Sequence, residues 1–252
     1  MADLQGQVAV VTGAARGLGA GVAAALARAG AAVALADLDG DVAGETAAAL
    51  AADTGTGAIG LGVDVADEDA VTALAERVES ELGPIDIWVN NAGVTRPAML
   101  HKMAVSDFDL VMAVHARGTF LGVREAARRM IQRGRGGVIL NVTSSAGLQG
   151  TIGQINYAGA KGAITAMTKS AAKELARHDI RVNAVAPVAA TPMTEKIRTD
   201  EKLRERYLAS IPLGRFAEAE EVASAFVYLA SPAAAYVTGQ VLCIDGGLYM
   251  AS

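Results

Sequence analysis

Short apolar runs, many of them β-branched, alternate along the chain with longer alanine-rich stretches. The strands predicted from the short runs are Val8–Thr12, Ala32–Ala36, Ala58–Val63, Asp86–Asn90, Val138–Val142, Arg181–Ala186 and Gln240–Ile244. Several of these runs are apolar at nearly every position, which is typical of strands that are covered on both faces. The alternation therefore predicts βα units arranged around a parallel sheet.

The longer stretches predict the helices that cross over between parallel strands. These helices are Gly17–Ala29, Val42–Ala52, Glu68–Leu82, Val105–Arg133, Asn156–Arg177 and Ala219–Leu229. Gly30 and Gly83-Pro84 follow two of them as stop signals, since glycine accepts left-handed dihedral angles and proline cannot continue a helix. No linker interrupts this rhythm, so we predict one domain over residues 1–252.

Residues 188–212 depart from the pattern because a charged, helix-like piece, Glu195–Tyr207, stands between the sixth and seventh predicted strands. The connection is longer than most in compact α/β domains. It follows the carboxyl end of a strand, where such sheets bind ligands. We therefore predict a substrate lid at 188–212, and the alternative is a solvated surface helix.

Composition and charge exclude several classes of function. Hydrophobic residues make up 52% and charged residues 19% of the chain, as in globular proteins. A net charge of −5 excludes a broad attraction to nucleic-acid phosphates, and no uninterrupted apolar segment of about 20 residues predicts a membrane span. The chain start leaves no room for a signal peptide, and the single Cys243 predicts a buried, inert thiol in a cytoplasmic protein.

A glycine-rich turn, Thr12–Gly19, lies between the first predicted strand and the first helix. Glycines in this place let the backbone approach a pyrophosphate, which the N–H groups at the helix start would hold. The spacing G-x-x-x-G-x-G differs from the commoner G-x-G-x-x-G, but its position is that of a dinucleotide site. The predicted cofactor contacts in this turn are Gly13, Arg16, Gly17, Leu18 and Gly19.

Asp37 ends the second predicted strand and is followed by Leu38, a further predicted contact of the cofactor. An acid here would hydrogen-bond the adenosine ribose hydroxyls. A 2′-phosphate about 4 Å away would be repelled by about 4 kcal/mol per charge pair at an effective dielectric constant near 20. Asp37 therefore predicts NAD rather than NADP, although Arg16 could bind a 2′-phosphate. The alternative for Asp37 is the start of a turn.

Tyr157 and Lys161 are four residues apart in a predicted helix, so their side chains share one face. Lowering the pKa of tyrosine by roughly two units needs about 2.7 kcal/mol of preference for the phenolate, which a neighbouring ammonium and an oxidised nicotinamide would supply. Ser144 follows the fifth predicted strand and would hydrogen-bond the substrate oxygen. The alternative is a helix with one snorkelling lysine. Three scattered histidines and one cysteine predict no metal site.

Four motifs in order, the Thr12–Gly19 turn, Asn90–Gly93, Ser144 and Tyr157-x-x-x-Lys161, resemble the short-chain dehydrogenase/reductase family over nearly the whole chain. The resemblance implies an α/β, single-domain Rossmann fold, with a doubly wound parallel seven-stranded sheet and helices on both faces. It implies that Lys161 binds the nicotinamide ribose and that the protein is a homotetramer. The further cofactor contacts that it implies are Asp64, Val65, Asn91, Ala92, Gly93, Pro187 and Val188.

The chain departs from the family pattern at two places. Pro187–Thr191 lacks the usual glycine after the proline and is one residue short. His115 aligns with the family's catalytic asparagine, which helps to hold a water that links the lysine to solvent. An imidazole could hold that water, and its ionisation near pH 6.5 would add a second step to the pH–rate profile. The alternative is a histidine that only packs within the helix Val105–Arg133.

Three functions remain open at this point. The first is an NAD-dependent oxidoreductase that interconverts a small secondary alcohol and its ketone, which Asp37 favours. The second is a 3-oxoacyl-[acyl-carrier-protein] reductase, which the last forty residues resemble closely, although Asp37 counts against it. The third is a catalytically silent NAD sensor. The support for it is His115 and the altered Pro187–Thr191 segment. The evidence against it is that Ser144, Tyr157 and Lys161 are all present.

Overall fold

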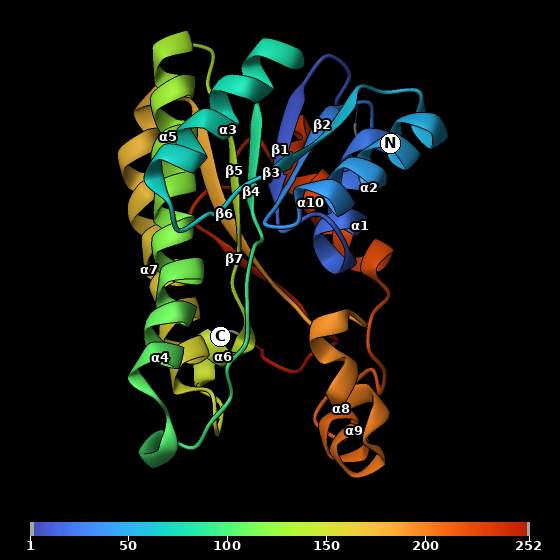
Figure 1. Ribbon diagram of the computed structural model, residues 1–252, viewed down its shortest axis with the longest axis vertical. Coiled ribbons are helices and arrows are strands. Elements are labelled where there is room, and N and C mark those ends of the chain that lie inside the picture. The colour runs from blue at the N-terminus through green and yellow to red at the C-terminus, as the bar shows by residue number, and fades with distance from the viewer. Residues whose placement is uncertain (1–2, 251–252) are drawn as a thin grey trace.

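A computed structural model, which describes residues 3–250, shows one sheet of seven parallel strands in the order β3-β2-β1-β4-β5-β6-β7 (Figure 1). The strands are β1 Val8–Thr12, β2 Ala32–Asp37, β3 Ala58–Gly62, β4 Ile87–Asn90, β5 Gly137–Val142, β6 Ile180–Pro187 and β7 Val241–Ile244. All pairings are parallel, so the carboxyl ends of the strands meet at one edge of the sheet. The order reverses between β1 and β4, where sheets of this kind bind ligands.

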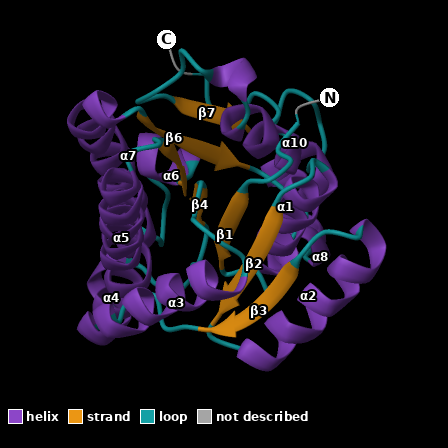
Figure 2. Cartoon of the chain, turned by 90° about the horizontal axis from the view of Figure 1, so that it is seen from above, coloured by secondary structure: helices purple, strands orange, loops and turns teal. Residues whose placement is uncertain are grey.

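Helices cover both faces of the sheet, as the view along the strands shows (Figure 2). On one face lie α1 Gly17–Arg28, α2 Gly40–Thr54 and α10 Ala219–Ala230, and on the other lie α3 Glu68–Glu81, α5 Gly118–Arg133 and α7 Ile155–Leu175. Shorter helices are α4 Val105–Met112, α6 Ser145–Gln149, α8 Glu195–Thr199 and α9 Glu201–Leu208. Single 3₁₀ turns span Leu100–Lys102, Ala176–His178, Pro192–Thr194 and Pro232–Ala234. None of the helices within residues 3–250 is long and apolar enough to cross a membrane.

The two faces of the central strands build two separate hydrophobic layers. On β1, Ala9 and Val11 pack toward α1 and α10, whereas Val8 and Val10 pack toward the opposite layer. Alternate residues of a strand point to opposite faces, so a run that is apolar throughout fills both layers at once. The predicted doubly wound fold is confirmed, and each predicted strand ends within one residue of the observed one.

Two predicted helical regions differ from the structure. The stretch predicted as a single helix from Val105 to Arg133 is divided into α4, a π-helical turn Ala113–Arg117 and α5. Extra residues in a π turn widen the helix and often mark functional sites. The charged piece Glu195–Tyr207 consists of two helices, α8 and α9, because Asp200 has an extended backbone and caps α9 through its side chain. The short helix α6 was not predicted.

Buried polar side chains connect β4, β5 and α7 beneath the carboxyl edge. The Trp88 indole donates to Asn90 at 2.8 Å, Asn90 donates to Asn141 at 2.9 Å, and Asn141 donates to Thr168 at 3.0 Å. All four residues are at most 5% exposed. Gly122 of α5 makes room for them, because a Cβ there would overlap the Asn90 oxygen and lie 2.7 Å from the Trp88 nitrogen.

We expect Gly122→Ala to lower the free energy of unfolding by about 1–3 kcal/mol, the usual cost of inserting a methyl group into a packed interior. The control is Gly44→Ala in α2, where an added Cβ has no heavy atom within 4 Å and should instead stabilise the helix by about 0.5–1 kcal/mol. Urea denaturation can be followed by the fluorescence of Trp88, the single tryptophan. An equal change in the free energy of unfolding in the two variants would contradict this prediction, because it would mean that the buried polar side chains beside Gly122 move aside for an added methyl group without cost.

Candidate active site

The glycine-rich turn after β1 is shaped by close backbone contacts. A Cβ on Gly13 would lie 2.7 Å from the Cα of Ala92, and a Cβ on Gly19 would overlap the Gly13 carbonyl. Gly13 and Gly17 also have φ angles of +65° and +63°, in the left-handed region. The turn therefore leads into α1 with its backbone accessible, as a pyrophosphate site requires.

Asn91 fastens this turn to the end of β4. Its side-chain amide donates to the carbonyls of Thr12 at 2.9 Å and Gly13 at 3.0 Å. The Thr12 hydroxyl in turn accepts from the backbone N–H groups of Asn91 at 3.0 Å and Ala92 at 3.2 Å. The structure thus places Asn91 and Ala92 beside the turn, and the Asn91 side chain positions the loop.

The Asp37 carboxylate stands at the end of β2 and accepts two backbone hydrogen bonds, from Ala15 at 3.0 Å and Asp39 at 3.2 Å. Its charge is thus fixed next to the glycine-rich turn. Arg16, the one residue of the turn that could attract a 2′-phosphate, pairs instead with Asp39 at 3.2 Å. Asp39 would therefore compete with the 2′-phosphate of NADP for the guanidinium of Arg16.

The other predicted cofactor contacts lie along the same edge of the sheet. Leu38 is 79% exposed just beyond β2, and Asp64 borders an open, acidic hollow of about 400 Å³ whose wall includes Arg117. Val65 packs against α5, since a Cβ on Gly118 would lie 2.9 Å from its Cγ2. Leu18 packs on the core below the turn.

The altered segment after β6 continues the strand. Pro187 is the last residue of β6, and Val188 donates its N–H to Ile244 at 2.9 Å and accepts from Ala217 at 3.4 Å. Both backbone groups of Val188 are thus paired within the chain. The missing glycine is accommodated by this extended pairing.

Ser144, Tyr157 and Lys161 come together at the carboxyl edge, as predicted. Ser144 caps α6, and its hydroxyl accepts from the N–H of Ala146 at 3.1 Å; the same hydroxyl acts to lower the pKa of the Tyr157 phenol. Lys161 is 3% exposed, and its Nζ donates to the carbonyl of Val142 at 2.6 Å. That Nζ lies 5.5 Å from the centroid of the Tyr157 ring.

Burial sets the protonation of this cluster. Burial of the hydroxyl end raises the pKa of Tyr157 to about 12, although the hydrogen bond from Ser144 acts to lower it. Burial also lowers the pKa of Lys161 to about 7. The sequence-based expectation that Lys161 brings the pKa of Tyr157 toward neutrality is therefore wrong for the protein alone. Desolvation of the phenolate outweighs the neighbouring amine.

His115 lies in the π turn and faces this cluster. Its ring meets the Tyr157 ring edge-on, at 5.2 Å between centroids and an interplanar angle of 89°. Its Nε2 lies 3.0 Å from the N–H and 2.8 Å from the carbonyl of Val94, so it holds the loop after β4 in either tautomer. The close approach needs Gly93, where a Cβ would overlap the imidazole.

The other ring nitrogen of His115, Nδ1, is buried and has no hydrogen-bond partner among the described residues. Burial and the charge of Lys161 lower the pKa of His115 to about 3. The histidine is therefore neutral at physiological pH. The expected second ionisation near pH 6.5 is wrong for this residue, and an ionisation near neutral pH belongs to Lys161.

Asn156 is a site residue that the sequence analysis missed. It is fully buried at the start of α7, donates to the Arg96 carbonyl at 2.9 Å and accepts from the backbone N–H of Tyr157 at 2.8 Å. It thus fixes the loop after β4 against the first turn of the catalytic helix. Its position next to Tyr157 in the sequence gives no sign of this, because the contact joins segments sixty residues apart.

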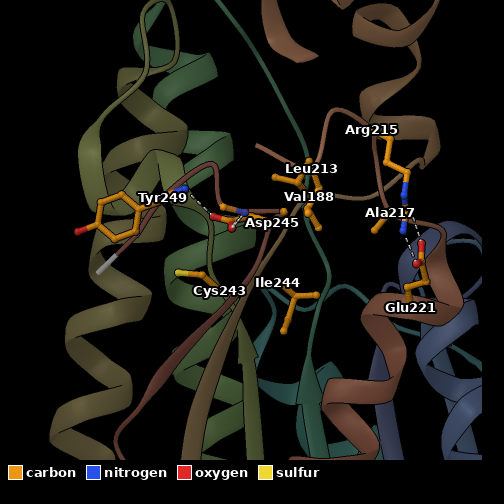
Figure 3. Close-up of a pocket in the computed structure, with 11 residues that line it drawn as sticks. Val188, Leu213, Arg215, Ala217, Glu221, Cys243, Ile244, Asp245 and Tyr249 are labelled. Carbon is orange, nitrogen blue, oxygen red and sulfur yellow. Dashed lines mark hydrogen bonds and ion pairs between the residues drawn. The ribbon is translucent and has the colours of Figure 1, made fainter. Parts of the chain in front are cut away.

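A pocket of about 320 Å³ lies beside the ends of β6 and β7 (Figure 3). Of the predicted site residues only Val188 lines it, so it is distinct from the catalytic cluster. Figure 3 shows Arg215 and Glu221 paired at one side, each nitrogen 2.7 Å from a carboxylate oxygen. Cys243 in its wall is half-buried, which corrects the predicted full burial, and burial raises the pKa of the thiol.

The low pKa of His115 gives an expected pH dependence of stability. In the unfolded chain His115 becomes protonated below its ordinary pKa of 6.5, whereas in the folded protein it stays neutral down to about pH 3. The free energy of unfolding of the wild type should therefore fall with decreasing pH, by up to about 1.4 kcal/mol per pH unit more than that of His115→Asn. Urea denaturation of both proteins between pH 7 and pH 4.5 measures the difference, and parallel curves would contradict the buried neutral imidazole.

Comparison with known proteins agrees with this geometry. A family model described as enoyl-(acyl carrier protein) reductase matches residues 13–249. Similar curated proteins include the 3-oxoacyl-[acyl-carrier-protein] reductases FabG of Thermotoga maritima, 45% identical over 97% of this chain and 98% of the relative, and of Aquifex aeolicus, 39% identical over 98% of both.

Solved structures agree equally well. A short-chain type dehydrogenase/reductase from Mycobacterium marinum superposes with a TM-score of 0.93 at 36% identity, over 99% of this chain and 98% of that one. A putative short-chain alcohol dehydrogenase from Sinorhizobium meliloti 1021 gives the same score and identity over 98% and 97%. The chain therefore belongs to the short-chain dehydrogenase/reductase family, whose members are nicotinamide-dependent oxidoreductases acting on CH–OH and C=O groups.

Proposed function

We propose that this enzyme reduces the 3-oxo group of an acyl thioester with NADH. The observation that carries the proposal is the half-buried Tyr157 ring beside Lys161, whose Nζ lies 5.5 Å from the ring centroid at the sheet edge, in a chain whose relatives are named for 3-oxoacyl reduction. A phenol with a pKa of about 12 stays protonated at neutral pH. It therefore carries the proton that carbonyl reduction needs, and Lys161 and the bound cofactor would have to stabilise the phenolate that is left behind. The comparisons thus favour the reductase over the secondary-alcohol dehydrogenase that Asp37 first suggested.

The residues divide the reaction among them. The reduced nicotinamide, when bound, supplies the hydride. Ser144 donates a hydrogen bond to the carbonyl oxygen and stabilises its developing charge. Tyr157 gives its proton to that oxygen, so the product is the hydroxyl. Lys161, anchored on Val142, stabilises the phenolate that remains and binds the nicotinamide ribose.

We assign His115 the role of a positioning residue in this reaction. It holds the loop after β4 through Val94, and its Nδ1 is buried without a hydrogen-bond partner among the described residues. A water there would be held by a neutral imidazole, which offers one donor and one acceptor. The substitution of the family's asparagine therefore leaves a polar group in place and argues against the silent sensor.

The proposed cofactor is NAD(H) because the Asp37 carboxylate is held beside the glycine-rich turn, where the adenosine ribose would lie, and because Asp39 pairs with Arg16. A 2′-phosphate would meet the carboxylate without gaining the guanidinium. Oxidation of a secondary alcohol by NAD is the second candidate, supported by the same carboxylate. The two candidates differ in the substrate half of the site.

A homotetramer is the proposed assembly. Large apolar side chains stay exposed along one helical path, including Leu110 on α4 and Phe120 and Ile131 on α5, each at least 39% exposed. Exposed apolar side chains of this size favour association, and the number of four subunits is taken from the family resemblance.

Tyr157→Phe should lower the rate of NADH-dependent reduction of an acetoacetyl thioester by at least about a hundredfold, because it removes the transferable proton while the ring keeps its packing. NADH binding, measured by fluorescence titration, should change little. Retention of a tenth of the wild-type rate would refute the assigned proton donor. A wild-type enzyme that reduces the thioester with neither NADH nor NADPH would refute the proposed reaction.

Asp37→Asn should narrow the preference for NADH over NADPH by about tenfold or more, the effect of 1.4 kcal/mol. The amide removes the charge and keeps one oxygen, which can accept one of the two backbone hydrogen bonds of Asp37. The ratio of kcat/KM for the two cofactors is the measurement. Asp53→Asn is the matched control, because it removes the charge of an exposed carboxylate that pairs with Arg28 and leaves Asp37, Asp39 and Arg16 intact; an unchanged ratio in Asp37→Asn would place the discrimination elsewhere.

A further inference from the structure

Thr143 is a buried polar residue beside the catalytic cluster to which the proposed reaction gives no role. It follows β5 directly and is only 1% exposed. Its hydroxyl donates to the backbone carbonyl of Lys161 at 2.8 Å, and its backbone N–H donates to the carbonyl of Val185 on β6 at 2.8 Å. Thr143 therefore joins the carboxyl edge of the sheet to the middle of the catalytic helix α7.

Two consecutive residues at the end of β5 hold both ends of Lys161. The Nζ atom donates to the carbonyl of Val142, and the backbone carbonyl of the same lysine accepts from the hydroxyl of Thr143. A free lysine side chain is a flexible four-carbon stem. Because the base and the tip of this stem are both bound to the strand, the position of the amine depends on where the backbone of α7 lies against β5.

The backbone of α7 packs closely against its neighbours at the same height. A Cβ on Gly147 of α6 would lie 2.5 Å from the carbonyl carbon of Lys161 and 2.7 Å from its Cβ. The hydroxyl of Thr165, one turn further along α7, lies 3.1 Å from the Lys161 carbonyl oxygen and 3.0 Å from the hydroxyl of Thr143. The carbonyl of Lys161 is thus bound both from the strand and from its own helix.

We propose that Thr143 is a positioning residue of the active site, whose hydroxyl fixes the height of α7 against the end of β5. Lys161 and Tyr157 are one helical turn apart and move together with that helix. Ser144 is the residue after Thr143 and stays with the strand end. The hydrogen bond therefore sets the distance between the proton donor and the residue that binds the carbonyl oxygen. The inference rests on the proposed function, which assigns these two roles.

The test is Thr143→Val, which replaces the hydroxyl by a methyl group of similar size and removes the hydrogen bond to Lys161. The reaction is the NADH-dependent reduction of the N-acetylcysteamine thioester of acetoacetate. The value of kcat should fall about tenfold, because the transfer of hydride and proton is sensitive to displacements of less than about 1 Å. The KM of the thioester should stay within about twofold, since binding tolerates such a displacement.

Two further variants separate positioning from general stability. Thr168→Val makes the same change at a fully buried hydroxyl of α7, which bonds to Ile164 and Asn141 and does not touch Lys161. In urea denaturation it should destabilise the protein by an amount similar to Thr143→Val, whereas its kcat should stay near that of the wild type. Thr143→Ser keeps the hydroxyl and should restore kcat to within about twofold of the wild type.

A Thr143→Val variant with the kcat of the wild type overturns the assignment while the proposed function stands. Loss of kcat by the same factor in Thr168→Val overturns it too, because the effect would then be one of stability alone. If Thr143→Val does not fold, Thr143→Ala decides by the same value of kcat, since it removes the hydroxyl without placing a methyl group against the carbonyl.

A wild type that does not reduce the thioester refutes the proposed function. The same variants are then compared in the oxidation of cyclohexanol by NAD, so that the two failures remain distinct. A wild type that is inactive in both reactions overturns the role of Thr143 together with the proposed function.

Discussion

The buried amine of Lys161, bound to the carbonyl at the end of β5, is the interaction on which the site depends. The hydrogen bond to Val142 joins the catalytic helix to the central sheet and sets the height of Tyr157 one turn earlier. Because the amine lies away from water, its charged form is disfavoured and its pKa falls to about 7. Its charge also helps to keep His115 neutral. Burial thus sets the pKa of Lys161, and burial is also the largest influence on the pKa values of Tyr157 and His115.

Amide and imidazole side chains hold the surrounding loops through backbone atoms. Asn91 binds the carbonyls of the glycine-rich turn, His115 binds Val94, and Asn156 binds Arg96. Contacts of this kind fix the position of a loop without constraining the side chains that it carries. The cofactor edge and the substrate edge can therefore change their specificity while the catalytic geometry is maintained.

The cofactor half and the substrate half of the site supply different parts of the functional conclusion. In the proposed function, Asp37 and the pair of Arg16 with Asp39 would act on the adenosine end of the cofactor, at β2. Tyr157 and Ser144 would act on the substrate, at the carboxyl end of β5. A preference for NADH is therefore compatible with a reductase reaction, although in the sequence analysis Asp37 counted against the 3-oxoacyl reductase.

The strands, the parallel order and the meeting of Ser144, Tyr157 and Lys161 were predictable from the sequence, because alternating apolar runs and a four-residue helical spacing are local properties. Burial was not predictable, since it is produced by residues that are distant in the chain. The reversal of the pKa expected for Tyr157, the neutral state of His115 and the role of Asn156 all follow from burial. The sequence by itself determined which chemical groups stand at the sheet edge, and the tertiary structure decided their charges and partners, because desolvation and contact depend on how the whole chain packs.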